Sequence, residues 1–295
     1  MFFLSEIDRK KLVSQILPHV RKVGVSEELR GWSWHKSPMK PYYDDARIPM
    51  YSVCSKYCPT GRDVFLNRVK RVEGVLNRKV VLGAAIHETV RTMLHAFMER
   101  KQLGFEEWYT SVLREKGISV PDEVVRDRSR RAWLYTQVMC ESHYMENVSR
   151  QPYASKRDVM ATALPFLVEH RISGELLGLS GLLGIDCYDY LRNVVFDLKV
   201  SNEGKDWYRL YPTGYAIVLE SVYEIPVDVG CVVYVKFRGD KLIVTSDLFF
   251  ISDDLRSWWI EERDKKLEIV AQKKDPGFPN VCYDGCIYRK GCGNE

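Results

Sequence analysis

The hydrophobic pattern of the chain changes near Ala163, and this change constrains the fold more than any other feature of the sequence. Before it, apolar side chains recur at helical spacing. Helices are predicted over residues 79–101, 105–117 and 122–147. After it, short alternating or apolar segments follow one another, as in consecutive strands joined by turns. Strands are predicted over residues 165–173, 176–190 and 193–200, with Phe166, Val168, His170 and Ile172 on one side of the first.

The rest of the chain alternates between helix and strand. Residues 209–223 return to helical spacing, while 227–237 and 241–250 predict a hairpin that turns at Gly239. A last helix is expected over 253–272. The predicted fold class is therefore mixed α/β, with a helical insertion before the core sheet. We expect one compact unit of four segments, at residues 1–78, 79–160, 161–272 and 273–295.

The composition is that of a globular protein. Apolar residues make up 45% of the 295 positions and charged residues 28%, which is enough apolar surface for a core. The net charge of +4 permits a nucleic-acid partner without requiring one. No apolar run approaches the ~20 residues that span a bilayer, and the first residues are too acidic for a signal peptide. We therefore expect a cytoplasmic protein, in which the eight cysteines are metal ligands or core residues.

Asp197 and Lys199 share one face of a predicted strand, because side chains two residues apart point the same way. The carboxylate suits a hard cation, and the ammonium suits a water molecule or the charge on a phosphate. Asp186 ends the preceding apolar segment, and Asp189 competes with it for the same role. If the two strands are antiparallel neighbours, Asp186 and Asp197 converge on one ion.

His87, on the first long predicted helix, adds an imidazole to these carboxylates. One imidazole with two carboxylates suits Mn²⁺ or Mg²⁺ better than zinc. Each residue alone is more often structural, but their order along the chain, followed by a tyrosine-bearing helix, favours a site. Other chemistries are excluded, because Arg91 breaks the zinc-protease signature and the sequence has no phosphate-binding loop, dinucleotide fingerprint or nucleophile elbow.

Three cysteines lie within the tail among glycines that allow tight turns: Cys282, Cys286 and Cys292. A fourth thiolate is available from Cys58, or from Cys54 close by. Four thiolates suit either a 4Fe-4S cluster or a structural zinc, and both remain open. A shared centre would join the two ends of the chain and link metal binding to folding. The remaining cysteines fall in apolar stretches and are expected in the core: Cys140, Cys187 and Cys231.

These constellations together resemble the CRISPR-associated, iron–sulfur-containing exonucleases of the RecB-like nuclease superfamily, in particular the variant found beside crenarchaeal type I-A systems. The resemblance rests on Tyr57–Asp63, Gly83–His87, Gly184–Asp186, Asp197–Lys199, Tyr211–Tyr215 and the tail cysteines. It implies a RecB-like, restriction-endonuclease-like nuclease core and an iron–sulfur module that joins the termini. Three features depart from the family pattern. The family often has Glu at Asp197 and Gln at Tyr211, and it more usually has two residues, not three, between the first two tail cysteines.

The resemblance also implies roles for individual residues. Mn²⁺ or Mg²⁺ would be held by His87, Asp186, Asp197 and the carbonyl of Leu198. Lys199 would position the attacking water. A 4Fe-4S cluster would be held by Cys58, Cys282, Cys286 and Cys292.

The expected function is metal-dependent exonuclease cleavage of DNA, at single-stranded ends or overhangs. The resemblance implies that this activity processes fragments for CRISPR spacer acquisition in antiviral defence, alongside integration proteins. Tyr211 and Tyr215 are candidates to stack on unpaired bases, although each suits core packing equally well. The alternative function is a non-catalytic DNA-binding scaffold of an integration complex, built on an iron–sulfur or zinc centre.

Overall fold

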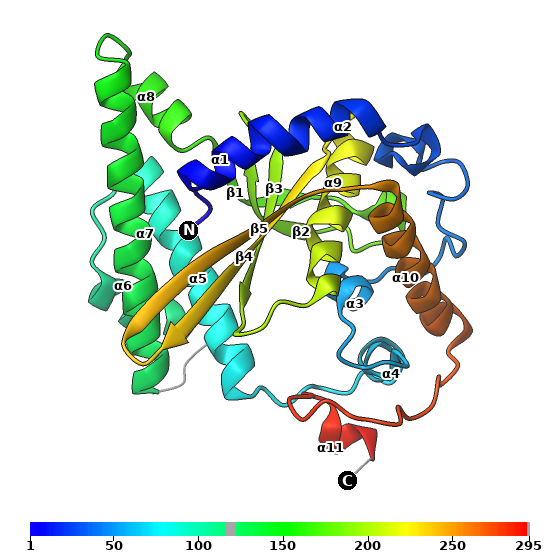
Figure 1. The fold of residues 1–295 in the computed structure, drawn as a ribbon. Coiled ribbons are helices and arrows are strands. Elements are labelled where there is room, and N and C mark those ends of the chain that lie inside the picture. Colours follow the sequence, from blue (N-terminus) through cyan, green and yellow to red (C-terminus); the bar gives the residue numbers. More distant parts are fainter. Residues whose placement is uncertain (116–121, 294–295) are drawn as a thin grey trace.

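A computed structural model of the chain describes residues 1–115 and 122–293. Residues 116 and 117 of one predicted helix, and residues 294 and 295 of the tail, lie outside this range. The fold is mixed α/β, as the sequence predicts, with a five-stranded sheet between two layers of helices (Figure 1). Within the described residues, no helix has the length and apolar character needed to cross a membrane.

The sheet follows the order of the sequence, β1-β2-β3-β4-β5. Its strands are β1 (Phe166–Ile172), β2 (Leu183–Asp189), β3 (Val194–Val200), β4 (Val229–Arg238) and β5 (Lys241–Phe250). Neighbouring strands are antiparallel except β3 and β4, which are parallel. Helix α9 (Leu210–Tyr223) connects this parallel pair, since parallel strands need a crossover. The predicted hairpin is present, and Gly239 in its turn has a φ of 53°.

Helices precede the sheet, as predicted, and also follow it. Those before it are α1 (Glu6–Lys11), α2 (Leu17–Val23), α3 (Met50–Cys54), α4 (Arg62–Val64), α5 (Arg78–Met98), α6 (Phe105–Glu115), α7 (Glu123–Arg150) and α8 (Lys156–Ala163). Those after it, besides α9, are α10 (Asp253–Gln272) and α11 (Arg289–Cys292). Short 3-10 or π-helical turns lie at Leu12–Ile16, Glu27–Leu29, Gly31–Ser33, Phe65–Val69, Glu175–Leu177 and Asp206–Arg209. The sequence did not predict α8, which begins after a Ser155 cap.

Two apolar cores lie on the two faces of the sheet. On one face, α3, α9 and α10 pack together over β3 and β4 (Figure 1). On the other face, α5 and the N-terminal segment cover the sheet, so that Phe2 reaches the core beside Phe196. Val195 belongs to the α9 side and Leu198 to the α5 side. Alternation along β3 therefore places Asp197 and Lys199 on the α9 side, opposite Leu198.

The predicted alternation along β1 is wrong. Phe166 and Val168 pack in the α5-side core, whereas Ile172 packs in the α9-side core. The reason is Glu169, whose φ of 48° is left-handed and turns the strand over between them. Such a conformation is uncommon for a residue with a side chain, and its cost is recovered elsewhere in the structure.

The predicted strand at 176–190 is correct only in its second half. Its first residues form a 3-10 turn that ends at Gly178, with a φ of 73°. Leu179 then makes a parallel bridge to Ile48 in the N-terminal loop, and β2 begins at Leu183. The glycines in this segment therefore shape a turn that anchors the N-terminal loop.

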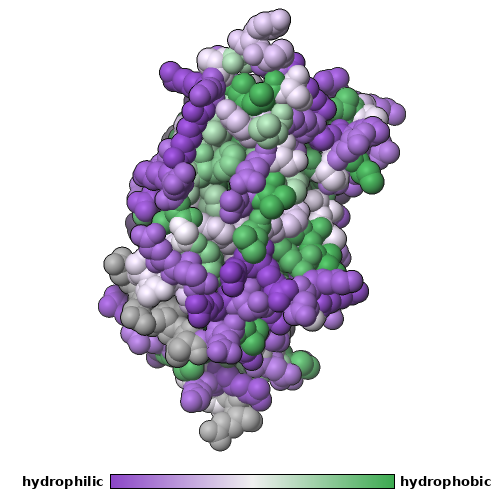
Figure 2. Space-filling model, turned by 90° about the vertical axis from the view of Figure 1, so that its left-hand side faces the viewer, coloured by the Kyte–Doolittle hydropathy of each residue, from purple (hydrophilic) through white to green (hydrophobic). Residues whose placement is uncertain are grey.

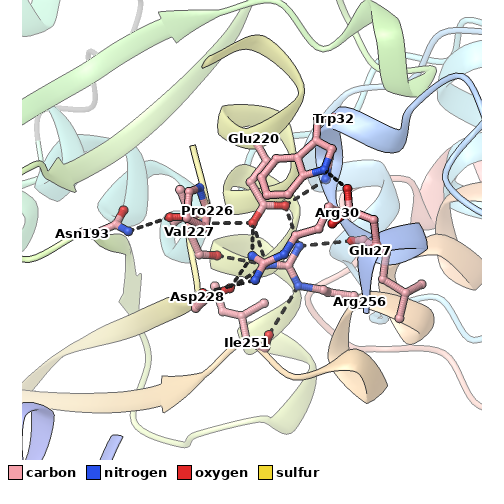
Figure 3. A network of polar contacts seen from close by, with 12 residues as sticks. Glu27, Arg30, Trp32, Asn193, Glu220, Pro226, Val227, Asp228, Ile251 and Arg256 are labelled. Carbon is pink, nitrogen blue, oxygen red and sulfur yellow. Dashed lines mark hydrogen bonds and ion pairs between the residues drawn. The ribbon is translucent and has the colours of Figure 1, made fainter. Parts of the chain in front are cut away.

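A buried network of charges joins the N-terminal segment to α9 and α10 (Figure 3). Glu220 of α9 and Arg256 of α10 are both fully buried and form a double hydrogen bond of 2.7 and 2.9 Å. Arg30 donates to the same carboxylate at 2.8 Å and to Asp228 at 2.5 Å. Two guanidinium groups thus share the charge of two carboxylates in a site with little water.

Backbone groups complete the network around Glu220. Its carboxylate accepts hydrogen bonds from the amides of Gly31, at 2.8 Å, and Val227, at 3.0 Å. A Cβ atom at residue 31 would lie 2.0 Å from the carbonyl oxygen of Ile217. Only glycine lets the N-terminal segment approach α9 this closely.

The outward side of α7 is exposed and partly apolar. This helix contacts α5 and α8 on its inner side. Leu134, Val138 and Met145 are exposed at spacings of four and seven residues, which place them on one helix face. Figure 2 shows this side of the molecule, where hydrophilic side chains predominate and apolar ones gather in patches.

Replacement of Glu220 by alanine should lower the free energy of unfolding by about 3–5 kcal/mol, because it leaves two buried guanidinium groups with Asp228 as their one remaining carboxylate in the network. Urea denaturation at neutral pH measures the change. The matched control is Glu261→Ala on α10, where the carboxylate is 65% exposed and a change within about 0.5 kcal/mol is expected. Equal losses in the two variants would contradict the structural role of the network.

Candidate active site

His87 and Asp186 form a contact between α5 and β2. The Nδ1 atom of His87 lies 3.2 Å from Oδ1 of Asp186. The second oxygen, Oδ2, accepts a hydrogen bond of 2.8 Å from the amide of Leu198 on β3. A helix and two strands therefore fix the position of one carboxylate.

The strand pairing explains why the two aspartates lie close together. β2 and β3 are antiparallel neighbours, and their ladder ends at the pair Cys187–Phe196. The next residues on the two strands are Asp186 and Asp197. Beyond the ladder, the side chain of Asp186 accepts the hydrogen bond from the Leu198 amide. In a continued ladder a backbone carbonyl would accept it.

Asp197 and Lys199 form a second pair on the α9 side of β3. The ammonium lies 2.9 Å from Oδ2 of Asp197 and donates a hydrogen bond of 3.2 Å to Oδ1. Asp197 is only 3% exposed, and its Oδ2 is buried without a hydrogen bond in that geometry. Burial, together with the charge of Asp186, raises the pKa of Asp197 to about 6, although Lys199 opposes the shift.

The same charges set the protonation of the first pair. Burial lowers the pKa of His87, but the carboxylate of Asp186 raises it more, so that the net shift is upward. For Asp186, burial raises the pKa, but His87, the Leu198 amide and Lys199 lower it below its usual range. Binding of a cation through His87 requires its proton to leave, because the neutral imidazole is the ligand.

The predicted ligands come together as pairs. Within residues 1–115 and 122–293, no three His, Cys, Asp or Glu side chains are arranged to hold one metal ion. The two pairs adjoin through β2 and β3, and the buried Oδ2 of Asp197 is an oxygen that a cation would satisfy. An imidazole and two carboxylates are donors that Mn²⁺ and Mg²⁺ accept, so the residues suit such an ion.

Tyr211 packs on the ammonium group of Lys199, a contact that the sequence did not predict. The Nζ atom lies 3.3 Å from the centre of the Tyr211 ring and 5.7 Å from that of Tyr208. Tyr211 and Tyr215 both project from α9, and burial raises their pKa values well above the ordinary range. The ammonium of Lys199 therefore contacts both the Tyr211 ring and its carboxylate partner.

Glu169 is a site residue that the sequence analysis missed. Glu169 and Asp186 lie at the position that the β1–β2 ladder skips, between the pairs Val168–Cys187 and His170–Ile185. The two line a small hollow with His87 and Arg91. Burial and the charge of Asp186 raise the pKa of Glu169. A Cβ atom on Gly184 would lie 2.9 Å from its carboxylate, so the glycine leaves room for it. In the sequence, Gly184 indicates that some neighbour lies close to the backbone. Only the strand pairing identifies that neighbour as Glu169.

The four predicted cluster cysteines lie at one end of the molecule, around the C-terminal tail. Cys58, Cys282 and Cys286 are partly exposed, and Cys292 is nearly buried. Burial raises the pKa of Cys286, and the neighbouring thiols of Cys58 and Cys282 raise it further. Arg62 donates a hydrogen bond of 3.0 Å to the sulfur of Cys292. Cys54, in contrast, lies in the α9-side core.

Hydrogen bonds hold the tail against residues 60–77. Thr60 donates to the carbonyl of Gly277 at 3.0 Å, and Asn77 donates to that of Gly285 at 2.9 Å. The amide of Val75 donates to the carbonyl of residue 287 at 2.8 Å. These contacts join the two ends of the chain through the protein itself.

Comparison with known proteins gives the family. A model of the family described as CRISPR-associated exonuclease Csa1 matches residues 1–295. The chain belongs to the Csa1 family of CRISPR-associated exonucleases. The membership that the sequence motifs predict is therefore confirmed.

Two Csa1 relatives match over most of their length. The protein named CRISPR-associated exonuclease Csa1 of Saccharolobus solfataricus is 29% identical over 275 residues, which are 91% of this chain and 92% of the relative. The protein of the same name in Thermoproteus tenax is 26% identical over 271 residues, or 91% of each chain. Both organisms are crenarchaea, in agreement with the variant that the sequence resembles.

Replacement of Asp197 by asparagine should stabilise the protein in EDTA at pH 7.5 by about 1–3 kcal/mol. The pKa of Asp197 is raised to about 6, so its ionised form opposes folding above that pH. The gain should shrink as the pH falls from about 6 to about 4, where the native carboxyl takes up its proton first. Urea denaturation across this pH range tests both statements.

Asp189→Asn is the matched control, because Asp189 is buried to the same degree but fully paired. Its carboxylate accepts hydrogen bonds from the amides of Leu191 and Arg192 and from the Arg192 side chain, at 2.8–3.0 Å. This variant should lose stability. A loss in both variants would show that Asp197 is a structural carboxylate.

Proposed function

We propose that this chain is a divalent-metal-dependent exonuclease that acts on single-stranded DNA or overhangs, with a RecB-like nuclease core. The observation that carries the proposal is the meeting of two pairs across β2 and β3. His87 contacts Asp186 at 3.2 Å, and the buried Asp197 contacts Lys199 at 2.9 Å. Membership in the Csa1 family supports the same reaction class.

The proposed metal ligands are His87, Asp186, Asp197 and the carbonyl of Leu198. A bound Mn²⁺ or Mg²⁺ would supply Lewis-acid activation of the phosphate and a water of lowered pKa. Asp186 is oriented for this role by the Leu198 amide at 2.8 Å. Hydrogen-bonded second partners of this kind fix the direction of ligand side chains.

Lys199 is proposed to position the attacking water and to stabilise the charge that grows on the phosphate. Its ammonium is held between the Asp197 carboxylate at 2.9 Å and the Tyr211 ring at 3.3 Å. A cation fixed before the reaction stabilises a developing negative charge without reorganisation. Tyr215, one turn further along α9, is proposed to contact substrate nearby.

The four cysteines Cys58, Cys282, Cys286 and Cys292 are proposed to hold a 4Fe-4S cluster. Two features support this: thiols from both ends of the chain meet at the tail, and Arg62 supplies a positive charge beside Cys292. Such a cluster would strengthen the link that the tail hydrogen bonds already make.

The proposed cellular role is the processing of DNA fragments before their integration as CRISPR spacers, together with integration proteins. The family description and the names of both relatives support a CRISPR role. The alternative is a non-catalytic DNA-binding scaffold of the integration complex. The observation that favours it is that no three candidate ligands in the described residues have metal-binding geometry.

Cleavage of end-labelled single-stranded DNA with Mn²⁺ tests the proposed reaction. Lys199→Met should slow cleavage about 10²–10³-fold, because a preorganised positive charge is lost. Asp186→Asn should be equally slow, and EDTA should abolish cleavage by the wild type. Denaturation profiles confirm that the variants are folded.

Lys236→Met on β4 is the matched control, because its ammonium lies 5.7 Å from the Tyr234 ring and outside both pairs. This variant should cleave at the wild-type rate. Full activity of Lys199→Met would reject the assigned site. A wild-type protein that binds DNA and cuts nothing with any divalent ion would favour the scaffold.

Anaerobic purification should give a brown protein with about four iron atoms per chain. Cys286→Ser should lose most of the iron, since a ligand thiolate is removed, whereas Cys140→Ala in the α5-side core should retain it. Iron analysis and visible absorption measure the result. A colourless wild-type protein with stoichiometric zinc would show that the chain holds a structural zinc and no cluster.

A further inference from the structure

A cavity of about 630 Å³ lies between the C-terminal tail and the ends of β3 and β4. Its lining also comes from residues 51–63, the start of α5, Arg128 of α7 and residues 283–288 of the tail. Two of the proposed cluster ligands, Cys58 and Cys286, are part of this lining. Its volume is in the range of pockets that enclose a single small ligand. The part that a bound cluster would leave free suits unpaired nucleotides, and the whole cavity is too small for a double helix.

Two tyrosines in the wall form an aromatic platform. The rings of Tyr57 and Tyr283 are stacked, with centres 4.5 Å apart and planes 28° apart. Both side chains are partly exposed and line the cavity. The ring of Trp207 packs perpendicular to that of Tyr57, with centres 4.9 Å apart, and supports it from outside the cavity lining. A flat, supported and accessible aromatic surface is what unpaired bases stack on.

Positive charges lie beside this platform. The ammonium of Lys205 is 5.7 Å from the Tyr57 ring, and that of Lys79 is 6.0 Å from the Tyr283 ring. Arg128 of α7 also lines the cavity. Two carboxylates, Asp63 and Glu203, are in the lining as well, so phosphates would lie on the lysine side. Aromatic rings next to cations that reach phosphates are typical of single-strand binding surfaces.

The cavity adjoins the candidate active site, whose own residues lie outside its lining. Val200 and Ser201, the residues after Lys199, line it at the end of β3. The hydroxyls of Tyr57 and Tyr208 are hydrogen-bonded at 2.8 Å, and the ring of Tyr208 lies 5.7 Å from the Lys199 ammonium. A strand bound on the platform would therefore continue towards Lys199.

We infer that this cavity is a binding subsite for single-stranded DNA, in which an unpaired base stacks on an outer face of the Tyr57–Tyr283 pair and the flanking phosphates contact Lys79 and Lys205. The inference rests on the proposed function for its choice of DNA as ligand. It adds a path for the strand and gives the tail a part in substrate binding.

Fluorescence anisotropy with a labelled oligo(dT) in EDTA measures binding without cleavage. Tyr283→Ala and Tyr57→Leu should each weaken binding about tenfold, since each removes a stacking surface. Tyr283→Phe and Tyr57→Phe should bind like the wild type, because the ring remains. Lys205→Gln should reduce the slope of log Kd against log salt concentration by about 0.7, as expected for one lost phosphate contact.

Tyr153→Ala is the control for aromatic loss at the surface, because Tyr153 is 100% exposed and outside the cavity lining. Its binding should be unchanged. A direct measurement guards against indirect effects on the tail: photocrosslinking of an iododeoxyuridine oligonucleotide should label peptides that contain Tyr57 or Tyr283.

The outcomes separate this inference from the proposed function. Unchanged affinity in both tyrosine variants, or crosslinks only elsewhere, would overturn the subsite even if the wild type cleaves DNA. Weakened affinity in both, with the crosslink, would establish the subsite even if the wild type cleaves nothing.

Discussion

The buried carboxylate of Glu220 is the contact on which the arrangement of the α9 side depends. It receives two guanidinium groups and two backbone amides, and these come from the N-terminal segment, α10 and the chain before β4. Breaking such a group leaves charges in the core without partners, so the elements are held in one relative position. Because α9 also carries Tyr211, this packing sets the surface against which Lys199 rests.

The candidate site uses the sheet in a different way. Where the β2–β3 ladder ends, side chains replace the backbone as hydrogen-bond partners, and Asp186 and Asp197 fall at that point. The two carboxylates have opposite pKa shifts: at Asp186, His87, the Leu198 amide and Lys199 together outweigh burial, whereas at Asp197 burial and the charge of Asp186 outweigh Lys199. Unequal environments for neighbouring carboxylates are common where cations or substrates bind. Lys199 contacts the Asp197 carboxylate as its charged partner and the Tyr211 ring as its nearest aromatic partner.

Much of this could be predicted from sequence, because periodicity reports local structure well. The strand at Val194–Val200, the helix at Leu210–Tyr223 and the final hairpin follow directly from their patterns. Glu169 could not be found, since its left-handed backbone breaks the alternation on which the prediction rests. The contact of Tyr211 with Lys199 depends on how α9 packs, which no local pattern encodes. Cys54 and Cys58 look equivalent in sequence, and only the packing of α3 places Cys54 in the core.

The tail hydrogen bonds to residues 60–77 have a consequence for the order of events during synthesis. Thr60 and its partner at Gly277 are 217 positions apart, so this contact waits until nearly the whole chain has left the ribosome. The strands of the sheet are translated earlier. The pair of stacked rings at Tyr57 and Tyr283 is thus among the last features to form. A nascent chain would therefore contain the candidate carboxylates of the sheet before the two tyrosine rings can meet.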